Sequence, residues 1–129
     1  MNLAVNFALV GLGGALGACC RYSMSLLLAD PVKSVPLATL SVNVLGALIA
    51  GFVVTILFSR GLIPGALQLF IVVGFLGGFT TFSAFSVESL RLLQTGSISI
   101  AMANIFLNVI GSLLAVMLGA FTAAKFMAD

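Results

Sequence analysis

The feature that most constrains this chain is the length of its segments without a charged side chain. These charge-free segments are Met1–Cys20, Ser34–Ser59, Gly61–Val87 and Leu92–Ala124. A helix needs about 20 apolar residues to cross a bilayer core of roughly 30 Å, and each segment is long enough. Because only helices and closed barrels satisfy their backbone groups in lipid, and the alternation of a barrel strand is absent, the sequence predicts an all-α membrane protein with four transmembrane helices.

The prolines, glycines and charged residues between these segments set the predicted span boundaries. We expect spans at about 3–28, 36–58, 64–93 and 97–125, within one membrane domain over 1–129. Proline cannot continue a helix, so the first span should end at Asp30-Pro31, whereas Pro64 suits the first turn of the third. The amino-terminal segment lacks a basic region before its apolar run, which predicts a retained span rather than a signal peptide.

The third span is too long and too rich in small polar residues to be one straight helix. Over residues 64–93 such a helix would measure about 45 Å. Glycine and threonine weaken helices, so Gly77, Gly78, Thr80 and Thr81 predict a break near 77–81, with the glycines allowing backbone geometry that a Cβ would hinder. Carbonyls freed at such a break can bind cations. The alternative is an unbroken helix with a glycine-rich packing face.

The distribution of positive charge predicts the topology. Arg60 and Lys125 lie on the side of the two termini, and Lys33, Arg91 and Arg21 lie towards the other side. Two against three is nearly no bias, and orientation follows that bias. The balance favours a dual-topology protein whose two copies form an antiparallel homodimer, although a chance balance in so short a chain is the alternative.

Small residues recur at four-residue spacing in the first and last spans. Gly13 and Gly17 form one such pair, and Gly111, Ala115 and Gly119 form a longer series. This spacing lets helices approach closely, so it predicts packing and not function. Four helices leave little room for a polar lumen, which makes oligomerisation expected.

Polar residues inside the predicted spans are the candidate functional groups. They are Asn43 in span two, Thr80, Thr81 and Ser83 beside Phe82 and Phe85 in span three, and Asn104, Asn108 and Ser112 on one stripe of span four. Amides and hydroxyls are uncharged donors, and phenylalanine ring edges are weakly positive, so the set favours an anion over a cation. The alternatives are hydrogen bonds between helices for the asparagines, and packing or lipid contact for the phenylalanines.

Four segments resemble the Fluc (CrcB) family of small bacterial fluoride channels. They are GGALGACCRY at 13–22, TLSVNVLG at 39–46, GFLGGFTTFSAFSVE at 74–88 and VIGSL at 109–113. The third segment is the most specific match. Together they follow the order of the family signatures along the whole chain.

This resemblance implies a passive, multi-pass channel of the bacterial inner membrane that exports fluoride and confers fluoride resistance. It implies an antiparallel homodimer with two pores and a central structural Na⁺ ion at the dimer interface, held by the backbone carbonyls of Gly77 and Thr80. Arg21 matches a vestibule arginine, and Glu88 matches an acidic position to which we assign no role. The residues that match the fluoride pathway are Asn43, Thr81, Phe82, Ser83, Phe85, Asn104, Asn108 and Ser112.

Three other functional classes fit the sequence less well. A proton-coupled dual-topology drug exporter needs a carboxylate at the membrane centre, and span one has none. A non-conducting membrane assembly subunit would leave the asparagine stripe without an ionic role. An enzyme is least expected without histidine or a nucleophile–base pair. The net charge of +2 is too small to indicate nucleic-acid binding, and Cys19 and Cys20 without histidine do not indicate a metal site.

Overall fold

The computed structural model describes residues 2–28, 35–59 and 65–128, and every regular element in these ranges is helical. The elements, in chain order, are α1 (Leu3–Leu27), α2 (Leu37–Ser59), α3 (Gly65–Leu67), η1 (Gln68–Leu76), α4 (Gly77–Phe79), α5 (Phe82–Gln94), α6 (Ile98–Phe106), η2 (Leu107–Gly111) and α7 (Ser112–Ala128). The two η elements are π-helical turns inside longer helices.

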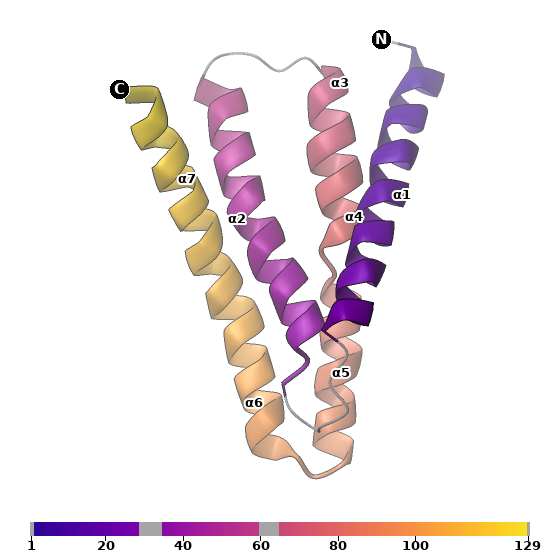
Figure 1. The fold of residues 1–129 in the computed structure, drawn as a ribbon, viewed down its shortest axis with the longest axis vertical. Coiled ribbons are helices and arrows are strands. Elements are labelled where there is room, and N and C mark those ends of the chain that lie inside the picture. Colours follow the sequence, from indigo (N-terminus) through magenta and orange to yellow (C-terminus); the bar gives the residue numbers. More distant parts are fainter. Residues whose placement is uncertain (1, 29–34, 60–64, 129) are drawn as a thin grey trace.

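Within the described residues, four helical stretches are long and apolar enough to cross a membrane. They are Leu3–Leu27, Leu37–Leu57, Gly65–Gln94 and Ile98–Ala128. These bounds lie within three residues of the spans expected from the sequence. Helix α1 begins and α7 ends at the same end of the molecule (Figure 1), as four crossings require. The expected helix ends at Asp30-Pro31 and Pro64 lie outside the described residues.

The third span is interrupted at two residues. Thr80 and Thr81 have extended backbone, with φ/ψ of −82°/158° and −154°/119°. Thr81 caps the helix that follows, because its side chain accepts from the Ala84 N–H at 3.2 Å. Gly77, in contrast, is helical, with φ −62° and ψ −36°. The expectation that this glycine supplies unusual backbone geometry is therefore wrong, since any residue adopts these angles.

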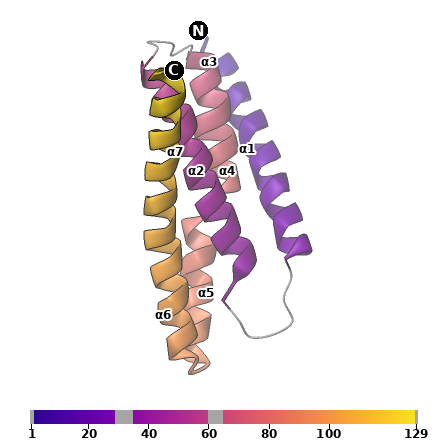
Figure 2. The ribbon, with the colours of Figure 1, turned by 60° about the vertical axis from the view of Figure 1, so that its left-hand side comes forward.

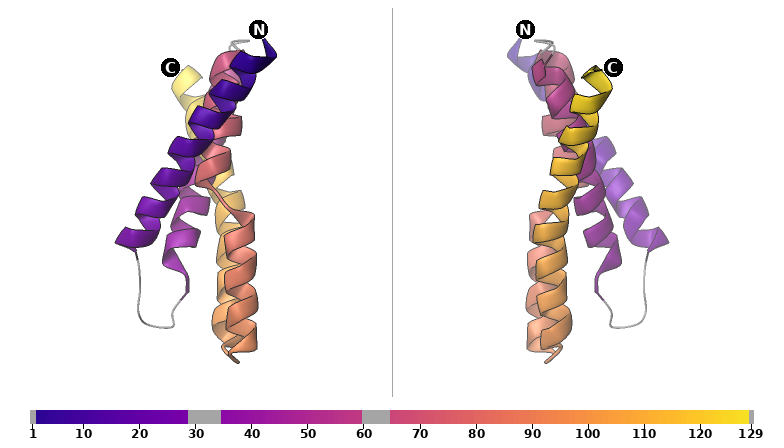
Figure 3. Two further views of the ribbon diagram at one scale, coloured as in Figure 1. Left: turned by 90° about the vertical axis from the view of Figure 1, so that its right-hand side faces the viewer. Right: turned by 90° about the vertical axis from the view of Figure 1, so that its left-hand side faces the viewer.

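The interruption is also the point at which the third span changes its packing partner. Before it, η1 and α4 pack on α1, and after it α5 packs on α6, while α2 packs on α7 throughout. Figures 1 and 2 show these pairs side by side. Figure 3 shows that the end of α1 diverges from α5, so that the first and third spans separate beyond the interruption.

The expected close packing of small residues is confirmed at two helix pairs. A Cβ on Gly17 of α1 would contact the carbonyl oxygen of Phe75 and lie 2.8 Å from the nitrogen of Phe79. A Cβ on Gly119 of α7 would contact the Leu48 carbonyl of α2 in the same way. Both glycines are buried. Backbones this close leave no space for a side chain.

Substitution of Gly17 tests this packing. We expect Gly17→Val to separate α1 from the third span at a cost of about 1–3 kcal/mol or more, because backbone atoms cannot move aside as a flexible side chain can. Gly11→Val is the matched control, since a Cβ at Gly11 meets nothing within 4 Å. Thermal denaturation in detergent should show a lower midpoint for the first variant alone, and equal midpoints would contradict the close contact.

Candidate functional site

Asn43 of α2 is hydrogen-bonded to both backbone groups of Thr81, where the third span is interrupted. Its Oδ1 accepts from the Thr81 N–H at 2.8 Å, and its Nδ2 donates to the Thr81 carbonyl at 3.0 Å. The Asn43 side chain is buried. In an unbroken helix the Thr81 N–H would donate to the Gly77 carbonyl. Asn43 therefore replaces one of the backbone hydrogen bonds lost at the interruption.

The polar stripe of the fourth span continues the hydrogen bonding away from Asn43. Asn43 Nδ2 donates to Asn108 Oδ1 at 2.9 Å. Asn108 Nδ2 lies 2.9 Å from Asn104 Oδ1 and 3.0 Å from the Asn104 carbonyl oxygen. Asn104 Nδ2 then donates to Ser89 Oγ of α5 at 3.0 Å. We call Asn43, Asn108, Asn104 and Ser89 the asparagine ladder. It joins α2, α5 and the fourth span through buried amides.

An open groove of about 650 Å³ runs beside the interruption. Its lining includes Asn43, Gly77, Thr80, Thr81, Phe82, Phe85, Asn108 and Ser112. The oxygen of the Ser112 hydroxyl is buried and has no hydrogen-bond partner among the described residues. A buried hydroxyl without a partner is costly, so this groove offers a donor to a polar occupant.

The two phenylalanines meet at the groove edge to face. Their ring centroids are 5.1 Å apart and their planes are inclined at 65°. Phe82 is 75% exposed in the single subunit, whereas Phe85 is 6% exposed. A ring edge carries the positive part of the quadrupole, so an edge-to-face pair can present positive surface without a formal charge.

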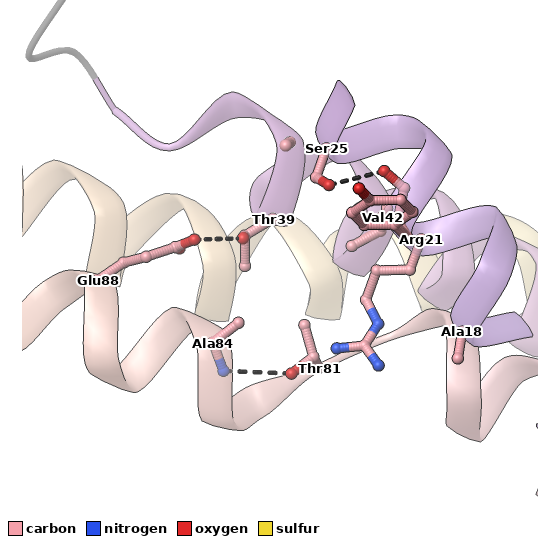
Figure 4. A pocket seen from close by; sticks show the side chains of 10 residues that line it. Ala18, Arg21, Ser25, Thr39, Val42, Thr81, Ala84 and Glu88 are labelled. Atoms are coloured by element: carbon pink, nitrogen blue, oxygen red, sulfur yellow. Dashed lines mark hydrogen bonds between the residues drawn. The ribbon is translucent and has the colours of Figure 1, made fainter. Parts of the chain in front are cut away.

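A second cavity, of about 360 Å³, lies between α1, α2 and α5 and contains charged residues (Figure 4). Arg21 reaches into it from α1, and its Nε donates to the Gly78 carbonyl at 3.1 Å. Glu88 of α5 accepts from Thr39 Oγ1 at 2.6 Å. Thr81 lines this cavity and also the groove of the phenylalanines. The interruption thus separates a cavity containing Arg21 from a groove lined by aromatic rings.

The structure brings most of the predicted site residues together around Thr81. Ser83 Oγ lies 3.1 Å from Thr81 Oγ1, and Thr80 Oγ1 donates to the Leu76 carbonyl at 2.9 Å. Asn104 and Ser83 do not line the groove: Asn104 is fully buried, whereas Ser83 is exposed. Gly77 is exposed on the surface of the subunit.

The residue-type argument missed three partners of the predicted residues: Thr39, Gly78 and Ser89. Gly78 acts through its carbonyl, which no side-chain pattern reveals. The sequence could have identified Ser89, because it lies four residues after Phe85 and therefore on the same helix face. Its hydroxyl donates to the Phe85 carbonyl at 2.8 Å.

Comparison with known proteins gives consistent matches over nearly the whole chain. Residues 8–120 match the family described as "CrcB-like protein, Camphor Resistance (CrcB)". Proteins named "Fluoride-specific ion channel FluC" are similar to this chain. The one from Chlorobium phaeobacteroides is 43% identical over 123 residues, covering 95% of each chain. Those from Francisella tularensis subsp. mediasiatica and Clostridium perfringens are each 43% identical, over 115 and 112 residues, covering 86% of this chain and 88% of theirs.

With a family match of this extent and relatives of this identity, the chain belongs to the CrcB family.

Proposed function

We infer that this multi-pass membrane protein is a fluoride-specific ion channel that lets fluoride leave the cell passively. The relatives carry that name, and one observation of the site supports it most directly: Thr81 lines both the Arg21 cavity and the phenylalanine groove. A small anion could pass from a guanidinium to hydroxyl and amide donors and then to ring edges. Such groups replace the hydration that fluoride loses.

The pathway that we propose follows the groove from the interruption. Thr81 and Ser112 supply hydroxyls from the groove lining, and the exposed Ser83 adds one beside Thr81. Asn43 and Asn108 line the polar side, and Phe82 and Phe85 supply ring edges. The Ser112 hydroxyl is the best candidate for direct ion contact, because it is buried without a partner among the described residues. Arg21 would raise the local concentration of anions at the mouth of the pathway.

Purified protein in liposomes tests the function. Liposomes loaded with fluoride should release it within seconds of a potassium ionophore being added, as followed with a fluoride electrode, while chloride-loaded liposomes retain their anion. Fluoride release no faster than from protein-free liposomes would reject the proposal. Equal release of chloride would reject the selectivity.

We further propose that the interruption lies at mid-membrane and that two subunits assemble antiparallel there. Helical segments of comparable length flank it, 65–79 and 82–94. Phe82 and Gly77 are exposed in one subunit although both belong to the predicted site, which suits a surface completed by a second copy. The near balance of Lys and Arg across the two sides allows the opposite orientations that such a pair requires.

Cysteine labelling tests the two orientations. In a background with Cys19→Ser and Cys20→Ser, a Lys33→Cys variant should react with an impermeant maleimide from outside the cell in about half of the molecules, as insertion without a charge bias requires. Complete labelling from one side only would reject dual topology.

The residues at the interruption fit a Na⁺ ion held by backbone oxygens. The Thr81 N–H donates to Asn43, which removes the helical partner of the Gly77 carbonyl at the negative end of a helical segment. The Gly78 carbonyl differs, because Arg21 already donates to it. We propose that the carbonyls of Gly77 and Thr80 from both subunits bind sodium, since the two oxygens of one subunit are too few for a hard cation.

Substitution of Gly77 separates the dimer from the subunit fold. A Cβ at Gly77 would meet nothing closer than the Val72 carbonyl oxygen at 4.0 Å, so Gly77→Val should leave the subunit helical. We expect it to prevent the close approach of a second copy and to yield monomers by light scattering, with loss of fluoride flux. Gly11→Val is again the control. A Gly77→Val protein that stays dimeric and still responds to Na⁺ would reject the proposed sodium site.

A further inference from the structure

The asparagine ladder has one direction of hydrogen-bond donation along its whole length. Asn43 Nδ2 donates to Asn108, Asn108 Nδ2 to Asn104, and Asn104 Nδ2 to Ser89. Ser89 Oγ then donates to the Phe85 carbonyl. The ladder thus begins at Thr81 and returns, through two other spans, to the first turns of the helix that Thr81 caps.

Backbone groups set this direction at both ends. At one end the Thr81 N–H can only donate, so the Asn43 oxygen must face it. At the other end the Phe85 carbonyl can only accept, so the Ser89 proton is committed to it and the Ser89 oxygen is left to accept from Asn104. If the Asn104 amide were flipped, its oxygen would face the Ser89 oxygen, which is left to accept. Its NH2 group would then face the NH2 group of Asn108.

Burial makes that flip costly and fixes the amides. Asn104 is 0% exposed, and Ser89 is 6% exposed, so neither has water available to compensate a lost partner. Asn108 lies in the π-helical turn η2, where its side chain also reaches the Asn104 carbonyl at 3.0 Å. Asn108 is therefore held to Asn104 by two contacts and to Asn43 by one.

We propose that Ser89 and Asn104 are positioning residues for the channel: they orient Asn108 and Asn43 along the pathway and do not contact the ion. This inference rests on the proposed function, because it concerns the same pathway. Asn108 and Asn43 line the groove, whereas Ser89 and Asn104 do not. The Ser89 hydroxyl fixes the Asn104 amide, and the side-chain oxygen of Asn104 in turn holds Asn108.

Ser89→Ala tests the proposal, with Ser86→Ala as its matched control. Both serines lie on α5, and each donates to the carbonyl four residues earlier at 2.8 Å. Ser89 alone of the two also accepts from an asparagine. In planar bilayers we expect Ser89→Ala to lower the unitary fluoride current by about 2- to 10-fold, the equivalent of one hydrogen bond, and Ser86→Ala to leave it unchanged. Unitary current does not depend on how many channels fold.

A rescue variant and a double variant complete the test. Ser89→Thr keeps the hydroxyl and should restore the current, whereas Ser89→Ala combined with Asn104→Leu should be no worse than Asn104→Leu alone, because both changes break the same contact. A unitary current in Ser89→Ala equal to that of the unmodified channel overturns the proposal. So does loss of the dimer together with the current, which assigns Ser89 to folding. Absence of fluoride current in the unmodified protein would instead reject the function itself.

Discussion

Replacing Asn43 with leucine is expected to abolish fluoride flux and to destabilise the subunit. Leucine has nearly the same shape but leaves the Thr81 N–H, the Thr81 carbonyl and the Asn108 oxygen without the partners they have now. Each buried polar group left unpaired costs about 1–3 kcal/mol. Both Thr81 groups lie at the helix interruption, so the loss changes the geometry that the proposed pathway and the proposed sodium site both require.

Ser41→Ala is a suitable control for Asn43→Leu. Ser41 lies on the same helix but lines a separate groove against η2 and α7. The Ser41→Ala variant should keep the oligomeric state, the thermal midpoint and the fluoride flux of the unmodified protein. Flux through Asn43→Leu at more than half the original rate, in correctly folded protein, would mean that the interruption does not depend on Asn43.

Replacing Phe82 and Phe85 together with isoleucine is expected to reduce fluoride flux by about tenfold or more, because isoleucine keeps apolar bulk but lacks the ring quadrupole. The burial of the two rings separates their roles. Phe82 is mostly exposed in the subunit, so Phe82→Ile should leave the stability of the subunit unchanged. Phe85 is buried, so Phe85→Ile should also lower the thermal midpoint.

Two exposed phenylalanines far from the groove provide the control. Phe7 of α1 and Phe126 of α7 are 70% and 67% exposed. The variant with Phe7→Ile and Phe126→Ile changes the same number of rings and should conduct normally in liposomes. Near-normal flux in the folded Phe82→Ile, Phe85→Ile double variant would remove the rings from the pathway and leave the hydroxyl and amide groups alone to select the ion.

The helices followed from the sequence because their cause is local. A charge-free run of sufficient length fixes a span whatever its neighbours are. The threonines after Gly78 disfavour a helix because their side chains compete for backbone hydrogen bonds. The interruption at Thr80 and Thr81 accordingly falls inside the predicted stretch, at 77–81. The predicted role of glycine geometry failed, since Gly77 is helical and small rather than strained.

The partners inside the site did not follow, because they depend on how each helix is rotated about its axis. Spacing placed Asn104 and Asn108 on one stripe but not the direction in which the stripe faces. The bond of Arg21 to the Gly78 carbonyl depends on a backbone group that only the interruption releases. The π-helical turn η2 shifts the register of the polar stripe on the fourth span. The propensities of its residues do not predict such a turn.

The asparagine ladder also has a consequence for biosynthesis. The chain is made from its amino terminus, so Asn43 enters the bilayer before Thr81 and Asn108 exist to pair with it. Until then its amide is without the partners that it has in the finished fold. The second span is the most hydrophobic of the four, which compensates for one polar group during insertion. Asn43 can pair with Thr81 once the third span is made, but its bond to Asn108 forms only when the last span arrives, so completion of the ladder is coupled to completion of the chain.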